Sequence, residues 1–143
     1  MLTEGGGGPL SVVVAPANQP DAQLLEATIE AVVVPRPAKD EIEQHLCLDK
    51  GYDNPTGRAA ATSGGHTPHI RRIGEEKQPT PKHPDAKPRR WVVERTIGWL
   101  NKCRAILVRY NKHAKNYLGL LQLGCSLLWY RRLRQLEDQP VLG

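Results

Sequence analysis

The chain has 143 residues, of which 39% are hydrophobic and 24% charged, as in one ordinary globular domain with a hydrophobic core. No signal-peptide pattern opens the sequence and no apolar run is long enough to span a bilayer, so we expect a cytoplasmic protein without a membrane partner. Three scattered cysteines, Cys47, Cys103 and Cys125, predict reduced thiols rather than a disulfide scaffold.

The charge is distributed unevenly along the chain. Residues 1–67 hold 4 Lys/Arg and 9 Asp/Glu, a net charge of −5, whereas residues 68–143 hold 16 Lys/Arg and 6 Asp/Glu, a net charge of +10. A basic half of this kind favours nucleic acid as a partner. A solvated basic face without a ligand is the alternative, because basic residues alone are a weak signal.

The first predicted elements are a β-hairpin and a helix. Gly5–Gly8 is expected to turn the chain into a strand over Leu10–Ala15, since no G-K-[ST] follows that would indicate a phosphate loop. Asp21 follows a proline and is expected to cap a helix. The apolar residues of that helix recur at helical spacing: Leu24, Leu25, Thr28, Ile29 and Val32.

A strand–helix–strand pattern occupies the middle of the chain. A strand over His45–Leu48 places Asp49 at its carboxyl end. A turn at residues 53–55 starts a short helix that Gly64 and Gly65 end, and Thr67–Ile70 forms the next strand. Because α/β proteins bind ligands beyond the carboxyl ends of their strands, Asp49 lies at a candidate site.

Two long helices are predicted in the basic half, over residues 89–110 and 114–134. Before them, residues 71–88 hold four prolines and many charges, which predicts an exposed loop. The second helix is apolar around most of its circumference, so we expect it to pack on two sides.

The first of these helices places a carboxylate among apolar residues. Two apolar stripes run along it: Val93, Ile97, Leu100 and Leu107 in one, and Val92, Trp99, Cys103 and Ile106 in the other. A narrow polar stripe with Arg90, Glu94 and Asn101 lies between them, so we expect Glu94 to be held between packed walls. The structural alternative is an Arg90–Glu94 pair at i, i+4 spacing, worth about 0.2–0.5 kcal/mol.

Asp49 and Glu94 would converge if the helix packs across the edge of the sheet. Converging carboxylates repel one another and need a divalent cation. Hard oxygen ligands beside a basic surface indicate Mg²⁺ or Mn²⁺ acting on a phosphodiester.

Three stretches closely resemble the C-terminal half of bacterial insertion-sequence DDE transposases: HLCLDKGYDNP, TPHIRRIGEE and RRWVVERTIGWLNKCRAILVRYNKHAKNYLGLLQLGCSLLWYRRL. The resemblance implies an α/β chain with a partial RNase H-like fold, made of a β-hairpin, helix, strand, short helix, strand and two long C-terminal helices. It implies a DNA transposase that uses Mg²⁺ or Mn²⁺ to cleave the ends of an element and join them to target DNA. The implied partners are double-stranded DNA and a full-length transposase or a second copy of this chain.

The resemblance also assigns roles to residues. Asp49, in D-K-G-Y-D, matches the second catalytic acid, and Glu94, in R-W-x-V-E-R-T, matches the third, so both would bind the metal. Arg90 matches a supporting arginine, and Lys102 is adjacent to Asn101, which occupies the place of a supporting lysine. The basic half itself predicts contacts with DNA phosphates by Arg71, Arg72, Lys77, Lys82, Lys87, Arg89 and Arg95.

The first catalytic Asp of such transposases lies upstream of the region that corresponds to Met1. We therefore expect residues 1–143 to be a single partial DDE domain that lacks the first core strand and the N-terminal DNA-binding segment, and to be inactive alone. Glu4 lies where relatives often have an Asp, but that position is not the catalytic one. A non-catalytic remnant that binds DNA or a transposase is the alternative, and a nuclease unrelated to mobile elements is a third hypothesis.

Four residues of the middle of the chain are candidate zinc ligands: His45, Cys47, His66 and His69. No C-x-x-C or H-E-x-x-H spacing accompanies them, which favours ordinary loop histidines over a zinc site. Cys103 and Trp99 lie at apolar helix positions and are predicted to be core residues, whereas Trp91, at the start of the helix, is more open and could stack on a base.

Overall fold

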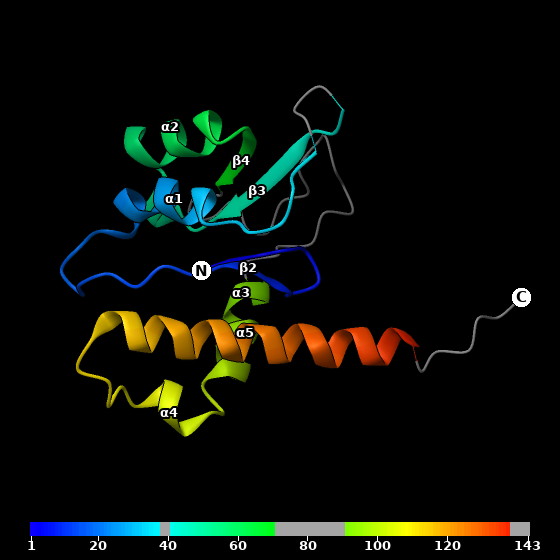
Figure 1. Ribbon diagram of the computed structural model, residues 1–143. Helices are drawn as coiled ribbons and strands as arrows, with labels where there is room; N and C mark the ends of the chain where they lie inside the picture. The colour runs from blue at the N-terminus through cyan, green and yellow to red at the C-terminus, as the bar shows by residue number, and fades with distance from the viewer. Residues whose placement is uncertain (38–40, 71–90, 138–143) are drawn as a thin grey trace, which may run out of the picture. The chain divides into compact units, whose positions relative to one another are not determined.

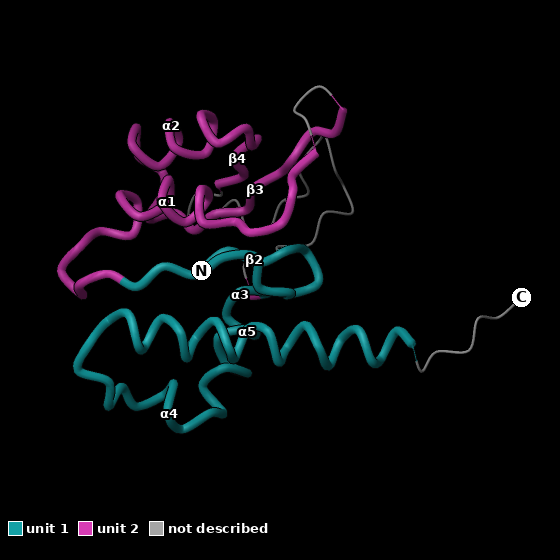
Figure 2. The backbone as a smooth tube through the Cα atoms, viewed as in Figure 1, with its two compact units in different colours: residues 1–14, 92–143 teal, residues 15–91 magenta. Residues whose placement is uncertain are grey.

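The computed structural model describes residues 1–37, 41–70 and 91–137, which form a mixed α/β structure, as predicted (Figure 1). The chain divides into two compact units (Figure 2). We call residues 15–91 the central unit, and residues 1–14 together with 92–143 the terminal unit. In the described ranges, no helix is both long enough and apolar enough to cross a membrane.

The central unit contains the predicted strand–helix–strand arrangement. Its elements are α1 (Asp21–Glu30), β3 (Gln44–Leu48), the 3₁₀ helix η1 (Lys50–Tyr52), α2 (Pro55–Ser63) and β4 (His66–Ile70). Strands β3 and β4 pair in parallel, with Cys47 opposite His69. Asn54 caps α2 by accepting a 2.9 Å hydrogen bond from the Gly57 N–H, and this cap fixes where the helix begins. Asp49 follows the last residue of β3, as predicted.

Helix α1 forms where the sequence predicts it, but its cap differs. Pro20 occupies the N-cap position and makes no side-chain hydrogen bond, and Asp21 lies in the first turn, where its charge interacts favourably with the helix dipole. The helix ends at Glu30, so Val32 lies outside it. The buried apolar residues of this unit are Leu25, Ile29, Leu46, Ala60 and Ala61.

The terminal unit joins the N-terminal hairpin to the C-terminal helices. Its elements are β1 (Leu2–Thr3), β2 (Pro9–Ser11), α3 (Trp91–Leu100, whose first residue is counted with the central unit), α4 (Arg104–Leu107) and α5 (Ala114–Glu137). The predicted hairpin is confirmed, but the strand predicted over Leu10–Ala15 is shorter, because β1 offers only two residues for pairing. Val12 and Val14 pack instead against the core of this unit.

The helix predicted over residues 89–110 is wrong in its length. Helix α3 ends at Leu100, and a turn leads to the short helix α4. Leu100 and Ile106 both contribute to the core cluster with Leu121. Six residues apart on one continuous helix, they would point about 120° away from each other, and the turn lets both face the same core.

Helix α5 is exposed over much of its circumference, so the prediction that it packs on two sides is wrong. Leu121 and Gly124 are its buried residues. Large apolar side chains of α5 remain exposed: Leu123, Leu127, Tyr130, Leu133 and Leu136. The apolar pattern of the sequence was misleading because these apolar residues are exposed: an apolar residue on a helix does not always lie in a packed face.

Candidate active site

Asp49 is the N-cap residue of η1, at the carboxyl end of β3. Its backbone is extended, and its Oδ1 accepts a 2.5 Å hydrogen bond from the backbone N–H of Lys50. The side chain is exposed. Burial, together with the negative charges of Asp21 and Asp49, raises the pKa of the nearby Tyr52 hydroxyl. The cap therefore orients a carboxylate at the end of a parallel strand, where its charge influences its neighbours.

Glu94 lies on the exposed face of α3, so the prediction that packed walls enclose it is wrong. Trp91 and Ile97, one turn away on either side, are 51% and 41% exposed. The buried face of the helix consists instead of Val92, Thr96 and Leu100. Glu94 therefore projects from the side of the helix that faces away from the core of the terminal unit.

The other predicted positions of α3 and its following turn are also exposed. Trp99 is 36% exposed, and Cys103 is exposed at the N-cap of α4, so neither is the core residue that was predicted. Asn101 and Lys102 lie in the turn after the helix rather than on its polar stripe. All three cysteines are free, as predicted.

Most of the predicted basic residues lie outside the described residues: Arg71, Arg72, Lys77, Lys82, Lys87, Arg89 and the supporting Arg90. Arg95 is described. Its guanidinium donates a 2.5 Å hydrogen bond to the Gly6 carbonyl and stacks over the Trp99 ring at 5.0 Å. A contact between Arg95 and DNA remains a prediction.

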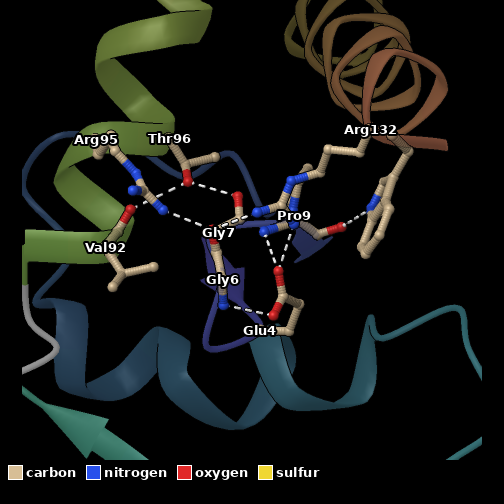
Figure 3. A network of polar contacts seen from close by, with 10 residues as sticks. Glu4, Gly6, Gly7, Pro9, Val92, Arg95, Thr96 and Arg132 are labelled. Atoms are coloured by element: carbon tan, nitrogen blue, oxygen red, sulfur yellow. Dashed lines mark hydrogen bonds and ion pairs between the residues drawn. The ribbon is translucent and has the colours of Figure 1, made fainter. Parts of the chain in front are cut away.

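The glycine turn of the hairpin is held by Glu4 (Figure 3). The Glu4 carboxylate accepts hydrogen bonds from the backbone N–H groups of Gly6, at 2.5 Å, and Gly8, at 2.6 Å. Arg132 of α5 pairs with the same carboxylate at 2.5 Å and also donates to the Gly6 carbonyl. These contacts give Glu4 a structural role in the turn.

Helix α3 is bound to the same turn by the residues that directly follow Glu94 (Figure 3). Arg95 donates to Gly6, and the hydroxyl of the fully buried Thr96 lies 2.7 Å from the Gly7 carbonyl and 3.1 Å from that of Val92. The hydroxyl thus has acceptors, which is why a polar side chain can occupy this core position. The turn therefore fixes the helix that carries Glu94.

Sequence reasoning missed this turn-centred network. The four consecutive glycines were correctly interpreted as a hairpin turn, but a turn pattern does not show what packs on it. One signal was present: Thr96 falls in line with Val92 and Leu100 at helical spacing, which is the pattern of a buried face.

The ionisation of Glu4 should make the stability of the terminal unit depend on pH. Burial raises the pKa of Glu4, but hydrogen bonds from Gly6, Arg132 and Gly8 and the charge of Arg132 together bring it below the ordinary value of 4.5. A lowered folded-state pKa stabilises the fold above the ordinary value, and this contribution is lost as the pH falls below it. In urea unfolding between pH 6 and pH 3, the stability advantage of the wild type over Glu4→Gln should therefore shrink below about pH 4.5. Parallel profiles would contradict this role of the carboxylate.

The described residues contain no group of three His, Cys, Asp or Glu side chains placed to hold one metal ion. Asp49 belongs to the central unit and Glu94 to the terminal unit. Each offers carboxylate oxygens at an exposed position, and these are the hard ligands that Mg²⁺ and Mn²⁺ prefer.

Comparison with known proteins identifies the family. Residues 46–131, more than half of the chain, match the transposase DDE domain, and this segment contains both Asp49 and Glu94. The chain therefore belongs to the family of DDE transposases. Over 142 residues it is 30% identical to a Burkholderia cepacia protein named as the transposase of insertion sequence element IS402; the match covers 96% of this chain and 64% of that relative. No solved structure matches the chain.

Proposed function

We propose that residues 1–143 carry the second and third acids of an insertion-sequence transposase, Asp49 and Glu94, on part of an RNase H-like fold. The activity would be metal-dependent cleavage of DNA at the element's ends and transfer of the cleaved strand to target DNA. The observation that carries the proposal is the position of Asp49, at the carboxyl end of a parallel strand with its carboxylate oriented by the Lys50 N–H. Glu94, within the same family match, supports it.

The two carboxylates fit a hard divalent cation by their chemistry. Both are exposed, and both are on elements whose local structure restrains them: Asp49 by its cap, and Glu94 by the anchoring of Arg95 and Thr96 to the turn. Bound Mg²⁺ or Mn²⁺ would supply Lewis-acid stabilisation of the charge that develops on the phosphate. Arg90 and Lys102 would support the site by neutralising phosphate charge.

The proposed partner is double-stranded DNA, from both the element's ends and the target. The charge of +10 over residues 68–143 supports this partner, since phosphate neutralisation dominates affinity for DNA. The loop predicted over residues 71–88 lies outside the described residues and stays a prediction. A full-length transposase or a second copy of the chain is proposed as a protein partner.

A non-catalytic remnant that binds DNA or a transposase is the second candidate. This candidate is favoured because residues 1–143 match only two of the three acidic positions of a DDE site. Two carboxylates alone bind a divalent ion weakly. This candidate shares the DNA-binding surface and lacks the chemistry.

Salt dependence of DNA binding tests the surface that both candidates need. We expect the affinity of untagged residues 1–143 for duplex DNA, measured by fluorescence anisotropy, to fall steeply between 50 and 200 mM NaCl on a log–log plot, with about −0.9 of slope per neutralised phosphate. Replacing both Arg71 and Arg72 by alanine should reduce the slope by about 2. Lys39→Ala, in the acidic half, is the matched control and should leave the slope unchanged. Binding that does not depend on salt, or no binding, would refute the proposed surface.

A further inference from the structure

Two histidines of the central unit meet on the exposed side of the β3–β4 pair. His69 Nε2 lies 2.9 Å from His45 Nδ1, at hydrogen-bonding distance, and the ring centroids are 4.9 Å apart. Both side chains are exposed. Both histidines lie on the strands that the sequence predicts, β3 and β4, and not in loops.

The parallel register explains why they meet. Side chains alternate between the faces of a strand, so His45 and Cys47 share one face of β3 while the buried Leu46 points to the other. Cys47 is opposite His69 on β4, and His45 is opposite Thr67. The same face therefore carries two imidazoles and a thiol, and the Glu43 carboxylate lies 4.0 Å from His45 Nδ1. This grouping arises from strand pairing, which is why no sequence spacing reveals it.

We propose that His45 and His69 form a binding site for a divalent late first-row transition metal, represented by Ni²⁺. Imidazole is a preferred ligand of these ions. At metal–nitrogen distances of about 2.0–2.1 Å, two nitrogens 2.9 Å apart subtend an angle of about 90° at the metal. That angle suits two adjacent positions of a tetragonal or octahedral site better than a tetrahedral one.

A metal ion can replace the hydrogen bond between the two imidazoles without any net release or uptake of protons. In the neutral pair, one imidazole donates its N–H and the other accepts. When the metal binds, both facing nitrogens present lone pairs, and the proton of the former donor moves to the other nitrogen of the same ring. Water fills the remaining positions, since the described residues hold no group of three such ligands around one point. The ion would link β3 to β4 in the folded chain.

Calorimetric titration of the untagged, metal-free chain with NiCl₂ tests the site. Nickel is chosen because it does not oxidise the three thiols, as Cu²⁺ would. We expect one equivalent to bind, and His45→Ala and His69→Ala each to weaken binding by about tenfold or more, because each removes one of two protein ligands. A parallel thermal melt should show Ni²⁺ raising the midpoint of the unmodified chain and of neither variant, since a ligand of the folded state stabilises it.

Two matched controls separate this site from adventitious binding. His113→Ala removes an exposed histidine of the terminal unit, and Cys47→Ala removes the neighbouring thiol on the same face; both should retain Ni²⁺ binding. The assignment is overturned if the unmodified chain binds no Ni²⁺. It is equally overturned if both histidine variants bind as tightly as the unmodified chain, or if His113→Ala weakens binding as much as they do.

Discussion

Asp49→Ala and Glu94→Ala are each expected to abolish strand transfer. The test protein is a polypeptide in which residues 1–143 follow a DDE transposase segment that supplies the first catalytic acid. In the proposed site, each variant would remove a carboxylate ligand from a cation whose position must be fixed for the charge at phosphorus to be stabilised. We expect a loss of about 10³-fold or more, because removing a single preorganised stabilising group already costs about 10²–10³-fold. The measurement is the yield of joined DNA product with Mg²⁺.

Controls for this prediction come from the same chain. Glu26→Ala and Glu30→Ala remove exposed carboxylates of α1 and should leave strand transfer unchanged. Residues 1–143 alone, supplied with Mg²⁺ or Mn²⁺, should neither nick nor join DNA, because they match two of the three acids. Strand transfer by residues 1–143 alone, lost in Glu4→Ala, would show that Glu4 is the first acid.

Gly8→Ala is expected to unfold or severely destabilise the terminal unit. Gly8 is buried, and a methyl group on it would lie 2.6 Å from Trp129 Cη2 and 2.7 Å from Arg132 Nη1. Trp129 is held in place by its own 2.7 Å hydrogen bond to the Pro9 carbonyl, and Arg132 by Glu4, so neither can move without losing a partner. Overpacking of this kind costs about 1–3 kcal/mol, and the lost hydrogen bonds add to it. Urea unfolding followed by tryptophan fluorescence measures the change.

Gly119→Ala is the matched control for this substitution. Gly119 lies in α5, and a methyl group there would meet no atom within 4 Å. Alanine is favoured over glycine inside a helix by about 1 kcal/mol, so this variant should be more stable than the wild type. Equal and small effects of the two substitutions would contradict the close packing of the turn against α5.

The local order of the central unit could be predicted from the sequence because its signals are local. Asn54 and Pro55 mark the start of α2, Gly64 marks its end, and β-strand composition places Asp49 after β3. Asp49 and Glu94 were proposed as catalytic acids through the resemblance of the stretches around them. Helical spacing alone could not distinguish a catalytic Glu94 from a surface ion pair between Arg90 and Glu94.

What could not be predicted depends on contacts between distant segments. The end of α3 is set by the shared core of Leu100 and Ile106, and no residue between them is a helix breaker. The exposure of Glu94 follows from the burial of Thr96, whose hydroxyl hydrogen-bonds to the Gly7 carbonyl 89 positions away. The meeting of His45 with His69 needs the register of a parallel strand pair.

The most direct test of the claim that Asp49 and Glu94 bind the catalytic metal is a change of metal preference. Asp49→Cys and Glu94→Cys, in the polypeptide that includes the first acid, would be assayed for strand transfer with Mg²⁺ and with Mn²⁺. A thiolate is a softer ligand than a carboxylate and binds Mn²⁺ in preference to Mg²⁺. We predict that both cysteine variants are inactive with Mg²⁺ and regain strand transfer with Mn²⁺, while the alanine variants stay inactive with either ion. Undiminished strand transfer with Mg²⁺ by either cysteine variant would contradict the assignment of that residue as a metal ligand.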